Sequence, residues 1–275
     1  MKGKVITGII GYPLSHTLSP VMHNAVYKKY GMDWVYKVFE TKPEDVGAFI
    51  KRLKKEKIRG INVTIPHKHA VMPFLDRIDK AAAVIGAVNT VVNKDGRLTG
   101  YNTDYLGFGE TLKKNKIKLN GKTVVMLGAG GAAHALAYTI NLQKPAKFYM
   151  MNIDIPITER LIKKLKLKKV MYSDISKTHE KDAIIASADF IINATSVGQH
   201  DNNVPYNIGK LKKGAVVYDI IYNPARTAFL KLAKRKGAKI LNGLDMLIYQ
   251  GMHSFKLWTG RTSDYGTIKK ALNKL

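Results

Sequence analysis

The sequence predicts an α/β protein of two units, because strand-like and helix-like segments alternate along its 275 residues. Two stretches support this fold class. The nearly continuous apolar run KTVVMLG at 122–128 is typical of a strand in a parallel sheet that is covered on both faces. GINVTIP at 60–66 alternates instead, as a strand with one polar face does. The length is sufficient for a core in each unit.

Glycine, proline and capping residues divide the first part of the chain into short elements. We expect strands at 4–10, 34–40, 58–65, 88–93 and 98–101, and helices at 20–30, 42–55, 76–85 and 105–115. Ser19 and Pro20 provide an N-cap and a first-turn proline for the first helix, and Gly31 follows its end. Asp95-Gly96 lies between the last two strands and indicates a hairpin.

A second series of elements begins near residue 120. We expect strands at 122–128, 147–152, 169–173, 189–195, 214–220 and 238–243, and helices at 131–142, 245–258, 266–275 and between the strands. Because no low-complexity linker separates the two series, we expect two α/β units in close contact.

The composition excludes several classes of protein. No apolar run approaches the ~18 residues of a transmembrane helix. The chain has no cysteine, which excludes disulfides, thiolate metal sites and cysteine nucleophiles. The N-terminal MKGKVITGIIGYP lacks a small-residue cleavage site, so we interpret it as a first strand. We therefore expect a cytoplasmic protein with no membrane partner and no metal site.

The net charge of +26 leaves three interpretations open. A basic protein can bind nucleic acid, and a protein of that class would need a clustered basic face. The basic runs at 51–57, 112–119 and 161–169 are scattered instead, with apolar residues at helical spacing, which indicates solvated helix faces. The third interpretation is a field that attracts anionic ligands. We expect no nucleic-acid partner.

Gly128, Gly130 and Ala133 form the pattern G-x-G-x-x-A between an expected strand and an expected helix. In this context the first glycine permits a tight turn, the second admits a pyrophosphate, and a small third residue lets the helix pack on the strand. The helix N-terminus then faces the phosphates. The pattern predicts dinucleotide binding; the structural alternative is a plain strand–turn–helix.

Asp154 follows the next expected strand at the distance typical of an acid that binds the adenosine ribose. Such an acid accepts hydrogen bonds from the two ribose hydroxyls and repels a 2′-phosphate. The alternative interpretation is a solvated loop aspartate.

Other polar residues lie at strand or helix ends, where a ligand can reach them. Alternation should place Asn62 and Thr64 on one face of their strand while Val63 and Ile65 enter the core. Pro66 should end that strand, so that the lysine two residues later reaches the same region.

Three further positions have both a structural and a ligand-binding interpretation. Thr17 and Ser19 beside a helix start suit a carboxylate, although Ser19 alone is explained equally well as an N-cap. Asn89 lies inside an apolar strand, where its amide needs partners. Asp104 either caps the following helix or faces a ligand.

Seven segments, taken together and in this order, resemble the shikimate dehydrogenase family over essentially the whole chain. They are GYPLSHTLSPVMHN, NVTIPHK, GAVNT, YNTD, GAGGAA, NATSVG and GLDMLIYQ. The resemblance implies reversible NAD(P)H-dependent reduction of 3-dehydroshikimate to shikimate, in the pathway to aromatic amino acids. It also implies a substrate-binding domain at 1–104 and 239–275, to which the C-terminal helices return, and a Rossmann-like cofactor domain at 105–238.

The resemblance also implies roles for individual residues. Lys68 and Asp104 would carry the proton transfer. The substrate would be held by Thr17, Ser19, Asn62, Thr64, Asn89, Tyr222 and Gln250. The cofactor would be held by Gly128, Ala129, Gly130, Gly131, Ala132, Asn152, Asp154, Thr195, Ser196, Val197 and Gly243. His16, His67 and His69 are rival catalytic candidates, which we rank below Lys68 because no neighbours that would orient them are identifiable.

Two departures from the family pattern bear on specificity. Thr17 replaces the usual serine, which adds a methyl group and leaves quinate open as a substrate beside shikimate. Ile153 stands where NADP-using members carry an arginine, and Asp154 follows it. Isoleucine cannot replace a bidentate arginine on a phosphate. We therefore expect NADP or NAD as cofactor, with NAD used at least as well, in a monomer or homodimer.

Overall fold

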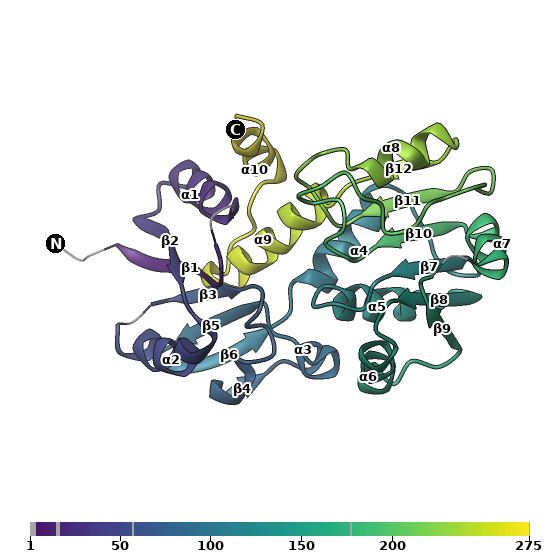
Figure 1. The fold of residues 1–275 in the computed structure, drawn as a ribbon. Coiled ribbons are helices and arrows are strands. Elements are labelled where there is room, and N and C mark those ends of the chain that lie inside the picture. The colour runs from purple at the N-terminus through teal and green to yellow at the C-terminus, as the bar shows by residue number, and fades with distance from the viewer. Residues whose placement is uncertain (1–3, 15–16, 57, 177, 275) are drawn as a thin grey trace. The chain divides into compact units, whose positions relative to one another are not determined.

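The computed structural model describes residues 4–14, 17–56, 58–176 and 178–274. By its internal contacts the chain forms two compact units, residues 1–107 with 248–275 and residues 108–247 (Figure 1). These bounds differ from the expected 104/105 and 238/239 boundaries. The strand β12 (Lys239–Leu241), expected in the substrate-binding domain, pairs with β11 (Val216–Asp219) of the second unit.

The first unit is built on a mixed six-stranded sheet. Its strands are β1 (Val5–Gly11), β2 (Trp34–Glu40), β3 (Gly60–Val63), β4 (Arg77–Ile78), β5 (Thr90–Lys94) and β6 (Arg97–Tyr101), in the order β2-β1-β3-β5-β6-β4. Its helices are α1 (Ser19–Lys29), α2 (Val46–Lys55), α3 (Lys80–Ile85), α10 (Tyr265–Leu272) and most of α9 (Leu244–Thr259), with the 3-10 turns η1 (Pro43–Asp45) and η2 (Met72–Phe74). The expected hairpin is confirmed: β5 and β6 are antiparallel, with Asp95 and Gly96 at φ 53° and 85°.

The two faces of this sheet differ, because side chains alternate along each strand. Ile61 and Val63 of β3 point into a core that includes Phe49 and Leu53 of α2. Asn62, between them, contacts α9 on the opposite face. The expectation that Ile65 enters the core is wrong: β3 ends at Val63, and Ile65 is 66% exposed.

The second unit has a six-stranded sheet that is parallel throughout. Its strands are β7 (Thr123–Leu127), β8 (Lys147–Asn152), β9 (Val170–Asp174), β10 (Phe190–Asn193), β11 and β12, in the order β12-β11-β10-β7-β8-β9. The helices are α4 (Asp104–Lys114), which begins in the first unit, α5 (Ala133–Leu142), α6 (Ile155–Leu165), α7 (His179–Ser187) and α8 (Ala228–Arg235). This strand order is that of a Rossmann fold, which confirms the expected class.

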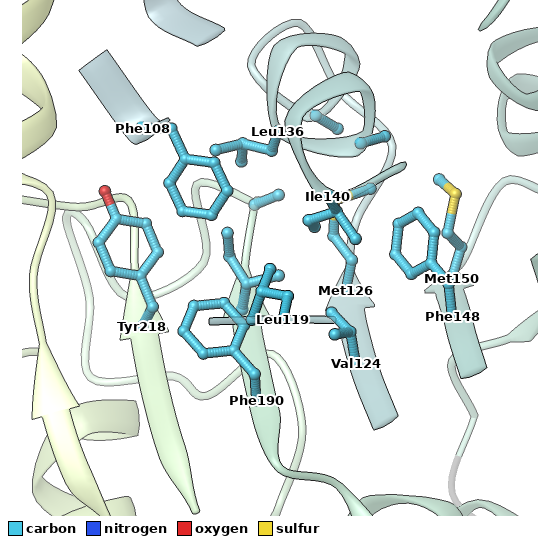
Figure 2. Close-up of a cluster of buried hydrophobic side chains, with 14 of the residues drawn as sticks. Phe108, Leu119, Val124, Met126, Leu136, Ile140, Phe148, Met150, Phe190 and Tyr218 are labelled. Carbon is cyan, nitrogen blue, oxygen red and sulfur yellow. The ribbon is translucent and has the colours of Figure 1, made fainter. Parts of the chain in front are cut away.

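Both faces of the parallel sheet are covered, as the apolar run at 122–128 predicted. On one face, Val124 and Met126 pack with Phe108, Leu136 and Ile140 (Figure 2). On the other face, Val125 and Leu127 pack with α7 and α8. The glycine loop after β7 is therefore held by a strand that is buried on both sides.

Candidate active site

Lys68 and Asp104 form an ion pair within the first unit. Lys68 Nζ donates to Asp104 Oδ2 at 2.6 Å, and the two side chains are 14% and 10% exposed. The backbone holds Lys68 close to β5, because its carbonyl oxygen accepts a hydrogen bond from Val88 N at 2.8 Å. The other carboxylate oxygen of Asp104 accepts from Asn89 Nδ2 at 2.8 Å. The carboxylate is thus held at both oxygens.

The helix that starts at Asp104 is capped by a different residue. Asn102 Oδ1 accepts from the backbone N–H groups of Asp104 and Tyr105, at 3.0 and 3.4 Å. This leaves the Asp104 carboxylate for the lysine. Of the two interpretations that the sequence left open for Asp104, capping is therefore wrong.

Asn89 has its amide orientation fixed by the backbone. Its Oδ1 accepts from Thr103 N at 2.6 Å, which directs Nδ2 toward Asp104 Oδ1. The same nitrogen also donates to Thr103 Oγ1 at 2.9 Å. Asn89, just before β5, thus has the hydrogen-bond partners that a buried amide requires.

Asn62 belongs to the same group of buried side chains, which we call the buried polar network. Its members are Tyr36, Asn62, Asn89, Thr90, Thr103 and Ser254, each less than 6% exposed. Tyr36 Oη donates to Asn62 Oδ1 at 2.7 Å, and Asn62 Nδ2 donates to Thr90 Oγ1 and Ser254 Oγ at 3.1 and 2.9 Å. Burial raises the pKa of Tyr36 well above its usual value, and a hydrogen bond with Ser19 partly opposes this shift.

The other substrate candidates of the first unit lie on three segments. Ser19 is buried and is the first residue of α1; its expected capping role is wrong, because Leu18 occupies the N-cap position and makes no side-chain cap. Thr17 Oγ1 accepts from Ser19 N at 3.4 Å. Thr64 is partly buried just beyond β3. Gln250 lies in α9, with its Oε1 3.5 Å from Thr103 Oγ1.

The rival histidines have backbone partners. His67 is fully buried, and its Nε2 lies 2.7 Å from the carbonyl oxygen of Thr41. His69 Nδ1 pairs with the carbonyl oxygen of Gly86. His16 lies outside the described residues. Both described histidines fix loops near Lys68.

The glycine loop of the second unit requires glycine at its first position. Gly128 has φ +96°, and a Cβ there would lie 2.5 Å from Thr195 Cγ2. A Cβ on Gly130 or Gly131 would meet no atom within 4 Å, so this side of the loop is open. Ala133, where α5 begins, is fully buried in the core. The residues present fit a dinucleotide phosphate: a tight turn, an open backbone and a helix start.

The loop after β10 meets the glycine loop, because β7 and β10 are neighbours at the point where the strand order reverses. Asn193 Oδ1 accepts from Thr195 N and Thr195 Oγ1, at 2.9 and 2.7 Å. Thr195 Oγ1 in turn accepts from Val197 N at 3.1 Å. These bonds give the segment that contains Ser196 a fixed turn.

Asp219, at the end of the adjacent strand β11, stabilises that turn through hydrogen bonds. Its carboxylate accepts from Asn193 Nδ2, Ile221 N and Thr227 Oγ1, at 3.1, 3.1 and 2.7 Å. Burial raises the pKa of Asp219 to about 6, although the hydrogen bonds oppose the shift.

Asp154 is the N-cap of α6, a role that its sequence position did not show. Its Oδ1 accepts from Ile157 N at 2.9 Å, and Asn152 Nδ2 donates to its backbone oxygen at 2.8 Å. Ile153 is 80% exposed at the end of β8. An anionic side chain and an uncharged one thus lie where the family pattern places an arginine.

Gly243 precedes α9 in the second unit, and its environment excludes any side chain. A Cβ on it would lie 1.8 Å from the carbonyl oxygen of Ile220. Tyr222 lies on the segment after β11, also in the second unit. Its contact with the substrate remains a prediction.

Sequence reasoning missed four residues that orient the candidates: Tyr36, Asn102, Asn193 and Ser254. Asn102 and Asn193 belong to the quoted segments YNTD and NATSVG, but no role was inferred for them. Ser254 and Tyr36 had no local signal in the sequence, because their partners come from distant parts of the chain. No helix of the described residues has the length and apolarity needed to cross a bilayer. Within the same residues, no His, Asp and Glu side chains cluster as a metal site would require.

Comparisons with known proteins find relatives over most of the chain. Residues 9–91 match the shikimate dehydrogenase substrate binding domain, and residues 243–272 match the shikimate 5'-dehydrogenase C-terminal domain. Shikimate dehydrogenase (NADP(+)) of Geobacillus kaustophilus is 41% identical over 268 residues, 96% of each chain.

Two solved structures cover almost all of the chain. Shikimate 5-dehydrogenase from Listeria monocytogenes, in complex with shikimate and NAD, has a TM-score of 0.91 at 32% identity, over 98% of this chain and 96% of that one. Quinate dehydrogenase from Corynebacterium glutamicum, in complex with NAD, has a TM-score of 0.91 at 30% identity, over 99% and 100% of the two chains. On this sequence similarity and this fold, the chain belongs to the shikimate dehydrogenase family.

Proposed function

We propose that this protein is an oxidoreductase that interconverts 3-dehydroshikimate and shikimate with a nicotinamide cofactor. The observation that carries the proposal is the Lys68–Asp104 pair, 2.6 Å apart in the unit that matches the substrate binding domain of the family. In this proposal the first unit binds the substrate and the second unit binds the cofactor. The relatives named for this activity share about 40% identity over nearly the full chain.

Lys68 is the proton donor of the reducing direction. The nicotinamide, when bound, supplies the hydride that makes the ketone an alcohol. Negative charge then develops on the ketone oxygen, and an ammonium group beside it stabilises that charge and delivers the proton. Asp104 holds the ammonium group in place through a hydrogen bond of 2.6 Å. In the oxidising direction the same pair accepts the proton.

The carboxylate and the ring hydroxyls of the substrate are assigned to polar side chains. Thr17 and Ser19 beside the start of α1 bind the carboxylate. The ring hydroxyls are bound or oriented by Asn62, Thr64, Asn89 and Gln250. The support for this assignment is the buried polar network, which connects Asn62 to Asn89, and Asn89 to Asp104.

The cofactor is NADP or NAD, with NAD used at least as well as NADP. The glycine loop would hold the pyrophosphate, and Asp154 would face the adenosine ribose. The support for NAD is that Ile153 offers no charge to a 2′-phosphate while Asp154 repels one. Relatives in this family are named for NADP(+), and structures of family members with NAD and with NADP+ are known.

The test is a spectrophotometric assay of the purified protein with shikimate and quinate, each with NAD and NADP. The expected result is shikimate-dependent reduction of at least one cofactor. No oxidation of shikimate with either cofactor would overturn the proposal.

Quinate oxidation is a second candidate activity. It is favoured by Thr17, whose methyl group changes the carboxylate end of the site, and by the similarity to a quinate dehydrogenase. In the same assay, a kcat/KM for quinate within ~100-fold of that for shikimate would establish this activity; a larger gap would exclude it as a main function.

A further inference from the structure

Ser254 contacts three other members of the buried polar network. It is in the part of α9 that belongs to the first unit, and its side chain is 0% exposed. Its Oγ lies 2.9 Å from Asn62 Nδ2, 2.9 Å from Thr90 Oγ1 and 3.2 Å from Thr103 Oγ1. It also donates to the carbonyl oxygen of Gln250 at 3.0 Å. One hydroxyl therefore contacts β3, β5, the segment before α4 and α9 itself.

The hydroxyl of Ser254 helps to fix the orientation of the Asn62 amide. Asn62 Nδ2 lies 3.3 Å from the carbonyl oxygen of Asn89, which can only accept, so this end of the amide must be the nitrogen. Ser254 gives its single hydrogen to Gln250 and presents lone pairs to Asn62. Tyr36 donates to Asn62 Oδ1 at the opposite end. The amide is thus held between two hydroxyls from distant segments.

The same hydroxyl also reaches the catalytic pair through two threonines. Thr90 and Thr103 both contact Ser254, and both hydrogen-bond to Asn89. Asn89 donates to Asp104, which binds Lys68. The mechanism assigns Ser254 no contact with substrate or cofactor, so its contribution must come through these neighbours.

We propose that Ser254 is a positioning residue for recognition of the substrate's ring hydroxyls. The inference rests on the proposed function and adds a specificity determinant to it. Without the hydroxyl, Asn62 Nδ2 loses its shortest hydrogen bond and shifts toward its two remaining acceptors, Asn89 O at 3.3 Å and Thr90 Oγ1 at 3.1 Å. A ring hydroxyl then meets a displaced amide, and binding weakens more than the chemical step does.

The test is the Ser254→Ala variant, with Thr7→Val as the matched control. Thr7 is equally buried in the first unit, and its hydroxyl lies 2.7 Å from that of Tyr27, which is not a member of the network. For Ser254→Ala we expect KM for shikimate to rise about 10-fold, with kcat changed less than about 3-fold and KM for the cofactor unchanged. Thr7→Val should lose comparable thermal stability with unchanged kinetic constants.

Substrate analogues separate positioning from a merely structural role. Two analogues of shikimate, each lacking one non-reacting ring hydroxyl, are compared with shikimate in both proteins. In the wild type, removal of the hydroxyl recognised by Asn62 should lower kcat/KM by about 100-fold or more. In Ser254→Ala the same removal should cost less than about 10-fold, because the recognising amide is already displaced.

Each outcome decides the inference. The inference would be overturned by an unchanged KM for shikimate in Ser254→Ala. It would also be overturned if removal of a ring hydroxyl lowered kcat/KM by the same factor in the variant as in the wild type, for both analogues. If the alanine variant does not fold, Ser254→Cys, which keeps a similar volume with a weak hydrogen bond, is measured against the same two criteria. A wild type that does not oxidise shikimate refutes the proposed function; an active wild type with an unaltered variant refutes only the role of Ser254.

Discussion

The candidate sites of the two units differ in whether side chains or backbone form them. In the first unit the site consists of side chains, and a buried polar network of residues from β2, β3, β5 and α9 fixes their orientation. In the second unit it consists largely of backbone: the turn at Gly128, the open glycine at 130 and a loop held by Asn193. A side-chain site depends on packing between distant segments, whereas a backbone site depends on the absence of side chains. Substitutions should therefore act differently in the two units.

The largest expected effect is the removal of a charged side chain from the first site. Lys68→Ala should lower kcat by about 10²–10⁴-fold, because the developing oxyanion loses its proton donor. The measurement is steady-state kinetics with shikimate, after circular dichroism has shown that the variant is folded. Lys54→Ala is the control, since Lys54 forms a surface ion pair with Asp76 at 2.9 Å and should change kcat little. A wild-type kcat in Lys68→Ala would remove Lys68 from the mechanism.

Stability against pH provides a second comparison between the units. Burial lowers the pKa of His23 in the first unit from 6.5 to about 3. The unfolded chain binds a proton below pH 6.5 while folded His23 stays neutral. His23 should therefore reduce the free energy of unfolding as pH falls from 6.5 toward 3, by a few kcal/mol. Urea unfolding of wild type and His23→Leu over this range should show a flatter profile in the variant.

Asp219 of the second unit should act with the opposite sign. Its pKa is raised to about 6, so the folded state holds a proton that the unfolded state releases, and stability should fall as pH rises from 3.8 to 6. Asp219→Asn should remove this slope. Parallel profiles of the wild type and either variant would contradict the assignment for that residue.

In the backbone site, an added methyl group should act on the cofactor alone. Gly130→Ala should leave thermal stability nearly unchanged, because its Cβ would have no atom within 4 Å. It should raise KM for the cofactor by about 10-fold or more, since the methyl group would occupy the approach of the pyrophosphate. Gly209→Ala, at another open glycine, is the control. An unaffected cofactor KM would show that the loop does not face the pyrophosphate.

The smallest expected effect concerns cofactor choice. Asp154→Asn retains an N-cap for α6 but removes the negative charge. The ratio of kcat/KM for NADP to that for NAD should rise several-fold, about the effect of one partly solvated charge. A strong NADP preference in the wild type would show that Asp154 does not oppose the 2′-phosphate.

Features of the fold and of the candidate sites differ in how well the sequence alone predicts them. The sequence predicts the parallel strands, the glycine loop and the Asp95-Gly96 hairpin, because each depends on residues adjacent in sequence. The short strand β4 was missed inside a region expected to be helical, since a two-residue strand has no periodicity. Lys68 and Asp104 were found through resemblance. Ser254 was not, because its partner Asn62 lies 192 residues away and only the fold brings them together.

The return of the chain to the first unit has a consequence for protein synthesis. Trp258 is fully buried there, and its indole nitrogen donates to the carbonyl oxygen of Val91 at 3.0 Å. Residues 1–107 leave the ribosome long before this tryptophan is made, because the 140-residue second unit is translated in between. At about 5–20 residues per second, the nascent sheet waits on the order of ten seconds or more before α9 can cover the face that carries Asn62. We therefore expect residues 1–107 to depend on a chaperone while the rest of the polypeptide is translated.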